Sequence, residues 1–100
     1  MIDWSRIEGF DWDEGNSRKS VDKHGVGQTE AEQVFLNEPL LVVEDWQHGG
    51  QEIRFHALGR TDARRLLHVT FTLRRASSLI RVISARPMHR KERAVYEQAS

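Results

Sequence analysis

Arginine and histidine residues are concentrated in the second half of this chain, where their side chains could bind phosphate and move protons. Residues 54–93 contain ten Arg, one Lys and three His, whereas residues 1–52 contain twelve of the fifteen Asp and Glu. A guanidinium binds a phosphate through two parallel hydrogen bonds, and an imidazole titrates near neutral pH. Since the formal net charge of the chain is zero, any affinity for nucleic acid must come from this uneven distribution.

The densest cationic stretch is SLIRVISARPMHRKERAVYE, residues 78–97, in which an apolar strand runs straight into a basic helix. Arg81, Arg86, Arg90 and Arg93 lie along this junction, as a site for a phosphate chain would require. Arg81 and Arg86 have opposite parity on a strand, so both reach one face only if the strand bends or ends before Arg86. The sequence leaves this open, and the basic helix is equally consistent with a solvated face or with a surface on which an acidic partner docks.

Cleavage of RNA without a metal ion requires activation of a 2′-hydroxyl, stabilisation of a charged phosphorane-like transition state and protonation of the leaving oxygen. Arginine and lysine suit the second task, because fixed cations bind phosphate oxygens, and histidine suits the other two. Metal chemistry has less support, since no pair of His and Glu residues has the spacing of metal ligands and cysteine is absent. We therefore expect neither a metal site nor a cofactor.

The elements that must position these residues begin with two helices. Asp13 is an N-cap for a helix over residues 14–24, and Gly25 supplies the left-handed residue that ends it. The T-x-x-E pattern that starts at Thr29 is a capping box, and it predicts a second helix that ends near Asn37.

From residue 40 onward the hydrophobic period changes from helical to alternating. The candidate strands are residues 40–46, 52–58, 66–73 and 79–85, with turns at Gly49-Gly50, residues 59–65 and residues 74–78, and a last helix over residues 89–98 after Pro87. Because these connections are too short for helical crossovers, the strands should form an antiparallel meander. The expected fold class is α+β: two N-terminal helices, an antiparallel sheet of about four strands covered on one face, and a C-terminal helix, in one domain spanning residues 1–100.

One face of the predicted sheet is polar. It carries Arg54, His56, His68, Thr70 and Thr72, with Arg60 at a strand end. We take Arg54, His56 and His68, together with the exposed aromatic residue Trp46, as candidate RNA-binding residues, since cations bind phosphates and bases stack on aromatic rings. Arg, His and Thr are also ordinary residues of a solvated sheet face, so alternation alone leaves both interpretations open.

The tripeptide Lys23-His24-Gly25 also has a purely structural explanation. Cations in the last turn of a helix offset its macrodipole, and a glycine caps it. Nothing in the sequence has the length of a signal peptide or a membrane span, and the absence of cysteine suits a reducing compartment. The expectation is a cytoplasmic protein that does not bind a membrane.

Three segments of the chain resemble the BrnT family of type II toxin–antitoxin toxins. They are FDWDEGNSRKSVDKHGV (residues 10–26), HALGRTDARRLLHVTFT (residues 56–72) and RVISARPMHRKERAVYE (residues 81–97), and they occur in the family's order and at suitable spacing. Two positions depart from the family pattern: Glu14 replaces a usual Pro, and Ser20 replaces a frequent Asn. Neither departure changes a basic residue.

The resemblance implies a RelE-like fold and a ribonuclease activity that arrests translation. It also implies neutralisation by a BrnA-like antitoxin with a ribbon-helix-helix domain, in a heterotetramer that represses its own operon and reaches operator DNA only through the antitoxin. Carried onto this chain, the catalytic candidates are Lys23, Arg60, Arg81 and Arg86 as phosphate clamps, with His24 or His56 for proton transfer. The competing interpretation is a non-catalytic RNA- or protein-binding module that acts as a corepressor.

Overall fold

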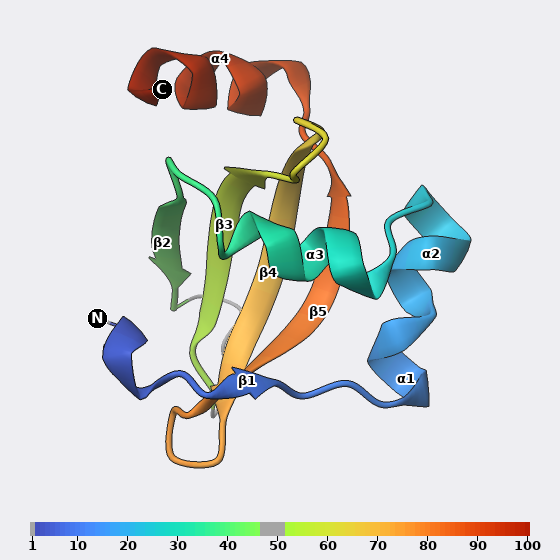
Figure 1. The fold of residues 1–100 in the computed structure, drawn as a ribbon, viewed down its shortest axis with the longest axis vertical. Helices are drawn as coiled ribbons and strands as arrows, with labels where there is room; N and C mark the ends of the chain where they lie inside the picture. Colours follow the sequence, from blue (N-terminus) through green and yellow to red (C-terminus); the bar gives the residue numbers. More distant parts are fainter. Residues whose placement is uncertain (1, 47–51) are drawn as a thin grey trace.

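The computed structural model describes residues 2–46 and 52–100, and these form one five-stranded sheet with helices packed against it (Figure 1). The strands are β1 (Gly9–Phe10), β2 (Leu41–Asp45), β3 (Arg54–Arg60), β4 (Leu66–Arg74) and β5 (Leu79–Pro87), in the spatial order β1-β5-β4-β3-β2. The helices are a 3-10 turn η1 (Trp4–Arg6), α1 (Glu14–Ser17), α2 (Lys19–His24), α3 (Gln28–Val34) and α4 (Arg90–Ala99). The predicted α+β class is confirmed, and the turn expected at Gly49-Gly50 lies outside the described residues.

The sheet has one strand more than the sequence predicted. Strands β2 to β5 form the expected antiparallel meander, whereas β1 pairs in parallel with the start of β5, Gly9 opposite Leu79 and Phe10 opposite Ile80. A two-residue strand shows no alternation of polar and apolar side chains. This is why the sequence did not reveal it.

The N-terminal helices follow their predicted caps in part. Asp13 caps α1 as expected, but the single helix predicted over residues 14–24 is broken into α1 and α2 at Arg18. Gly25 ends α2 in the left-handed region, at φ 65°. The capping box predicted at Thr29 is wrong, because α3 begins at Gln28 and the preceding backbone N–H donates to Glu30 instead.

The hydrophobic core lies between the sheet and α3. Its fully buried side chains come from the turn before α3, from α3 and from the three central strands: Val26, Ala31, Val34, Ala57, Leu67, Val69, Phe71, Ile80, Val82 and Ala85. Helix α3 crosses so close to β3 that a Cβ on Gly59 would lie 2.6 Å from Cγ1 of Val34. Glycine at this position therefore allows the helix to approach the sheet.

Side chains of α1 and α2 protect the edge of β5 where β1 has ended. Asn16 Nδ2 donates to the carbonyl of Val82 at 3.0 Å, and the backbone N–H of Ala85 donates to Ser20 Oγ at 2.8 Å. Both Asn16 and Ser20 are buried. Side chains from two short helices thus bond backbone groups on a strand edge that would otherwise be open to pairing with another strand.

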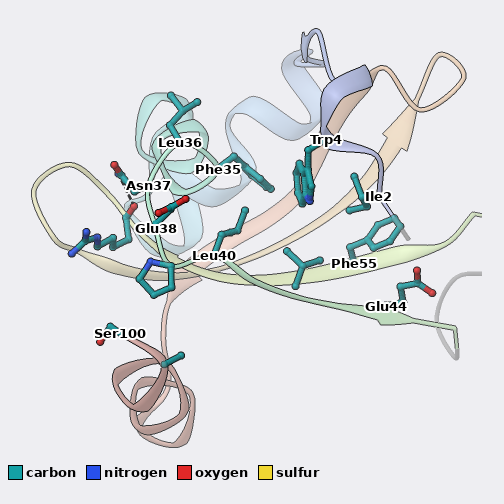
Figure 2. Close-up of a pocket in the computed structure, with 14 residues that line it drawn as sticks. Ile2, Trp4, Phe35, Leu36, Asn37, Glu38, Leu40, Glu44, Phe55 and Ser100 are labelled. Carbon is teal, nitrogen blue, oxygen red and sulfur yellow. Dashed lines mark hydrogen bonds between the residues drawn. The ribbon is translucent and has the colours of Figure 1, made fainter.

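We call the face of the sheet opposite α3 the outer face; it carries the predicted polar residues Arg54, His56, His68 and Thr70. Helix α3 covers one face of the sheet as expected, and α4 lies at one end of the sheet, with Ser100, which follows it, drawn below Leu36 and Phe35 in the view of Figure 2. The buried Tyr96 anchors α4, its hydroxyl donating to the carbonyl of Pro39 at 2.6 Å. Helix α4 therefore bounds one end of the outer face. None of the helices in the described ranges is long and apolar enough to cross a membrane.

Candidate functional site

A bulge in β5 brings Arg81 and Arg86 to the same face of the sheet. In the β4–β5 ladder Val82 pairs with Phe71 and Ser84 pairs with Thr70. Ile83, which lies between them on β5, has no partner on β4. One extra residue reverses the alternation of side chains beyond it. The parity conflict between Arg81 and Arg86 is therefore resolved in favour of a shared face.

Four residues from three adjacent strands form the centre of the outer face. The rings of His56 and His68 stack with their centroids 5.1 Å apart and an interplanar angle of 20°. Across the ladders, His56 lies opposite Thr70, and His68 lies opposite Arg86. We call His56, His68, Thr70 and Arg86 the His–Arg cluster.

Hydrogen bonds hold the His56 ring from both sides. Its Nε2 lies 2.9 Å from Asp45 Oδ2, and its Nδ1 lies 3.0 Å from Thr70 Oγ1. A hydrogen bond on each nitrogen fixes the orientation of the ring. His56 is thus held in place beside His68.

His68 is kept neutral by its surroundings. Burial lowers its pKa most, and the Arg86 charge lowers it further, to about 4; Glu92 acts in the opposite direction, and His56 and His89 add small decreases. Its Nδ1 is buried and has no hydrogen-bond partner among the described residues. At pH 7, His68 is therefore a neutral imidazole beside a guanidinium, ready to accept a proton.

This lowered pKa predicts how stability depends on pH. Unfolded His68 binds a proton below its ordinary pKa of 6.5, whereas folded His68 does so only below about 4. Stability should therefore be complete above pH 6.5 and fall as the pH drops from 6.5 to 4. Urea unfolding of the wild type and of His68→Gln at pH 7, 5.5 and 4.5 should show a smaller loss in the variant. Equal losses would show that another group causes the dependence.

Glu92 at the start of α4 occupies the guanidinium of Arg86. Arg86 Nη1 donates to Glu92 Oε1 at 2.8 Å and Nη2 donates to Oε2 at 2.9 Å, with both side chains less than a quarter exposed. These bonds from Arg86 lower the pKa of Glu92 to about 2, against the effect of burial and with help from the backbone N–H of His89. A bidentate carboxylate thus stands where a phosphate would bind.

Arg81 is engaged by two carboxylates at the corner between β1 and α1. Its Nη2 lies 3.0 Å from Asp13 Oδ2, and its Nη1 lies 3.5 Å from Asp11 Oδ2. The partners of Arg81 and Arg86 on β4 are four residues apart, which corresponds to roughly 13 Å along a strand. As the structure stands, different carboxylates hold the two guanidinium groups, so the arginines do not share a site.

One predicted RNA-binding residue, Arg54, extends the outer face away from α4, and a second, Trp46, lies exposed after β2. Arg54, at the start of β3, is exposed and has the same parity as His56. Trp46 directly follows β2 and is 68% exposed, as expected of an aromatic residue free to stack. Arg54 and the His–Arg cluster thus lie on one surface of the sheet.

Arg60, Lys23 and His24 lie apart from the His–Arg cluster. Arg60 is the last residue of β3. Burial raises the pKa of Tyr96 on α4, and the charge of Arg60 partly offsets this rise. Lys23 and His24 are exposed in the last turn of α2, beside the edge of β5. Within the described part of the chain, no hydrogen bond or ion pair joins these three side chains to the cluster.

Sequence reasoning missed two residues that shape the site, Asp45 and Glu92. Asp45 closes a predicted strand, and only the register of β2 on β3 places it within reach of His56. Glu92 had a visible signal, because it is the one acidic residue between Ser78 and Arg93. An isolated carboxylate in a cationic stretch predicts an internal ion pair.

The geometry suits the chemistry of a phosphodiester. A guanidinium can bind its charged oxygens, a neutral imidazole can accept a proton, and an imidazole backed by a carboxylate can donate one. The described residues contain no group of three or more His, Asp and Glu side chains that could hold a metal ion.

Comparison with known proteins identifies the family of the chain. Residues 12–92 match the family described as the ribonuclease toxin BrnT of type II toxin–antitoxin systems. The fold is similar to the crystal structure of the Brucella abortus ribonuclease toxin BrnT, with a TM-score of 0.64 and 22% sequence identity over 84% of this chain and 100% of that one. Comparison with curated protein sequences gave no match. Since the family match covers most of the chain, this protein belongs to the BrnT family of ribonuclease toxins of type II toxin–antitoxin systems.

Proposed function

We propose that this toxin is a metal-independent endoribonuclease that cleaves RNA on its outer face and thereby arrests translation. The observation that carries the proposal is the neutral His68 beside Arg86, with His56 stacked on it. Arg86 binds the scissile phosphate and stabilises the charge of the transition state. Arg54 and Trp46 bind the flanking nucleotides.

The two histidines divide the proton transfers. His68 accepts the proton of the attacking 2′-hydroxyl, and His56, whose ring is held by Asp45, protonates the leaving oxygen. A bound phosphate adds negative charge beside His68, which opposes the effect of Arg86 and raises the pKa of His68 toward neutrality. Substrate binding thus makes His68 a more effective base.

RNA must compete with Glu92 for Arg86. The carboxylate makes the same pair of parallel hydrogen bonds that a phosphate would make. Lys23, His24, Arg60 and Arg81 are outlying candidates that bind phosphates beyond the scissile one. Arg81 must first release at least one of its two carboxylates.

The antitoxin of this system is proposed to be a BrnA-like protein with a ribbon-helix-helix domain. Membership of a type II toxin family supports a protein antitoxin as partner. The two proteins would form a heterotetramer that represses its own operon, with the antitoxin contacting operator DNA. RNA as substrate places the action of the toxin in the cytoplasm, and residues 1–100 act as one toxin domain.

The decisive experiment is induced expression without the antitoxin, read on RNA. We expect growth arrest, with cleavage products that also form when purified toxin is incubated with RNA in excess EDTA. Cleavage that EDTA abolishes would contradict metal independence. Neither arrest nor cleavage would favour the non-catalytic module, in which the outer face only binds RNA or a partner.

A further inference from the structure

Three aliphatic residues lie together on the outer face, although the solvated face of an antiparallel sheet is normally polar. Leu41 lies opposite Leu58 across the β2–β3 ladder, and Val43 lies opposite His56. Val43 is 64% exposed, and Leu41 and Leu58 are half-buried. We call Leu41, Val43 and Leu58 the apolar shelf.

The apolar shelf is distinct from the hydrophobic core. Val42 and Ala57 alternate with the shelf residues along β2 and β3, and they belong to the core between the sheet and α3. The pocket of Figure 2 lies on that other face as well, because Val42 and Phe55 line it. The shelf therefore adds contiguous apolar surface to the outer face itself, as a binding site for an apolar group does.

The shelf is in line with the residues that we propose to cleave RNA. Leu58 lies directly opposite His68, and His68 lies directly opposite Arg86. From β5 to β2, the side chains are therefore a guanidinium, an imidazole and two leucines. Neighbouring strands are about 4.8 Å apart, so Leu58 lies about 10 Å from Arg86 between strand axes.

A nucleotide carries its own groups in the same order. Its phosphate is charged, its ribose carries the 2′-hydroxyl, and its base presents flat π-faces that pack on apolar surfaces. When Arg86 binds the phosphate and His68 accepts the proton of the 2′-hydroxyl, the base of that nucleotide continues toward Leu58. Ligand sites usually combine an apolar lining with a few placed polar groups, and this row of side chains has both.

We propose that the apolar shelf binds the base of the nucleotide whose 2′-hydroxyl attacks, and that it favours purines over pyrimidines. Leucine and valine side chains have no hydrogen-bond donor or acceptor, so they cannot distinguish the polar edges of the bases. They distinguish bases by apolar contact area, which is larger for adenine and guanine than for cytosine and uracil. This assignment rests on the RNA cleavage proposed above and adds the base that the site selects.

The first test varies the base of the attacking nucleotide. The substrates are short oligonucleotides that are 2′-deoxy except at one position, which carries adenine, guanine, cytosine, uracil or no base. We expect kcat/KM to be alike for adenine and guanine, about three- to tenfold lower for cytosine and uracil, and lowest without a base. Cleavage of all five substrates at one rate would overturn the proposal and leave the ribonuclease activity standing.

The second test changes the shelf, with a matched leucine as control. Leu58→Ala should lower kcat/KM for the purine substrates about tenfold, reduce the preference for purines and leave the abasic substrate unaffected. Leu58→Met keeps the apolar volume and should restore both the rate and the preference. Leu36→Ala, at a leucine that is 77% exposed after α3, should match the wild type. If Leu58→Ala slows all five substrates equally, Leu58 has only a structural role and the proposal is wrong.

The third test measures binding without cleavage. Adenosine 3′-monophosphate contains the base, the 2′-hydroxyl and the phosphate of the attacking nucleotide, and ribose 3-phosphate lacks only the base. We expect the ring current of adenine to shift the methyl resonances of the apolar shelf upfield, whereas ribose 3-phosphate leaves them in place. Val95, which is 56% exposed on α4, provides a methyl control.

The outcomes separate this proposal from the proposed ribonuclease activity. Unshifted shelf methyls would overturn the base site, whether or not the protein cleaves RNA. So would methyls that only a bound antitoxin shifts, because the shelf would then be a surface for docking a protein. Shifted methyls in a protein that cleaves no RNA would support the base site and contradict the ribonuclease activity.

Discussion

Arg86→Ala is expected to abolish growth arrest and to lower the rate of RNA cleavage by about 10²- to 10³-fold. Arg86 is the cation directly opposite the neutral His68, and loss of one charged donor at a developing negative charge has effects of this size. Arg86→Lys keeps the charge but loses the two parallel bonds, so its activity should lie between those of the alanine variant and the wild type. Cleavage of a labelled RNA under single-turnover conditions measures the rate for the wild type and for each variant.

Two controls separate catalysis from folding. Arg75→Ala removes an exposed arginine from the β4–β5 turn, at the other end of β5, and should retain full activity. Glu92→Gln keeps an acceptor for the N–H of His89 but loses the charge that occupies Arg86, so it should bind RNA more tightly than wild type. If Arg86→Ala keeps its toxicity, or if Glu92→Gln binds RNA more weakly, then Arg86 does not bind the scissile phosphate.

The largest loss of stability is expected from Asn16→Ala. The Asn16 side chain donates to the carbonyls of Val82 and Asp11, both at 3.0 Å, and accepts from the N–H of Asp13 at 2.7 Å. Asn16 is only 6% exposed, so the alanine variant leaves three backbone groups unpaired where water has little access. We expect a loss of about 2 to 4 kcal/mol in the free energy of unfolding.

Asn37→Ala is the matched control for this effect. Asn37 also donates twice, to the carbonyl of Arg60 and to Asp62 Oδ1, both at 3.0 Å, but Asn37 is only half-buried and water can reach these groups when the side chain is removed. Asn37→Ala should lower the free energy of unfolding by less than about 1 kcal/mol. For a chain of this size the melting temperature falls by about 4 to 8 °C per kcal/mol of lost stability. Thermal unfolding would therefore distinguish the two variants. Similar melting temperatures would show that Asn16 does not hold α1 to β5.

The sequence allowed most of the fold to be predicted, because strong periodicity and local caps specify elements. Alternation located the four long strands, and Asp13 and Gly25 marked the ends of the first helical segment. The break at Arg18 and the short strand β1 depend on contacts with β5, which is distant in sequence. Tertiary contacts of this kind leave no periodic signal.

The candidate site was predictable in its residue types and only in part in its arrangement. Alternation placed His56 and His68 on one face, but their stacking follows from the register of β3 on β4. Arg60 and Lys23 were grouped with Arg86 through the family resemblance, whereas the structure places them beyond the ends of the cluster. The carboxylates that engage Arg81 and Arg86 could not be assigned without three-dimensional contacts.

The bulge at Ile83 also gives a rule for reading related chains. On a regular strand, residues on one face are separated by an even number of positions, yet the two arginines of β5 are five positions apart. A relative with the same odd interval should therefore contain the bulge, and one with an interval of four or six should lack it. Deleting Ile83 alone would remove the bulge and leave Arg81 and Arg86 four positions apart, still on one face of a regular strand. Deleting a different single residue between them would be expected to keep both on one face only if the bulge is lost as well.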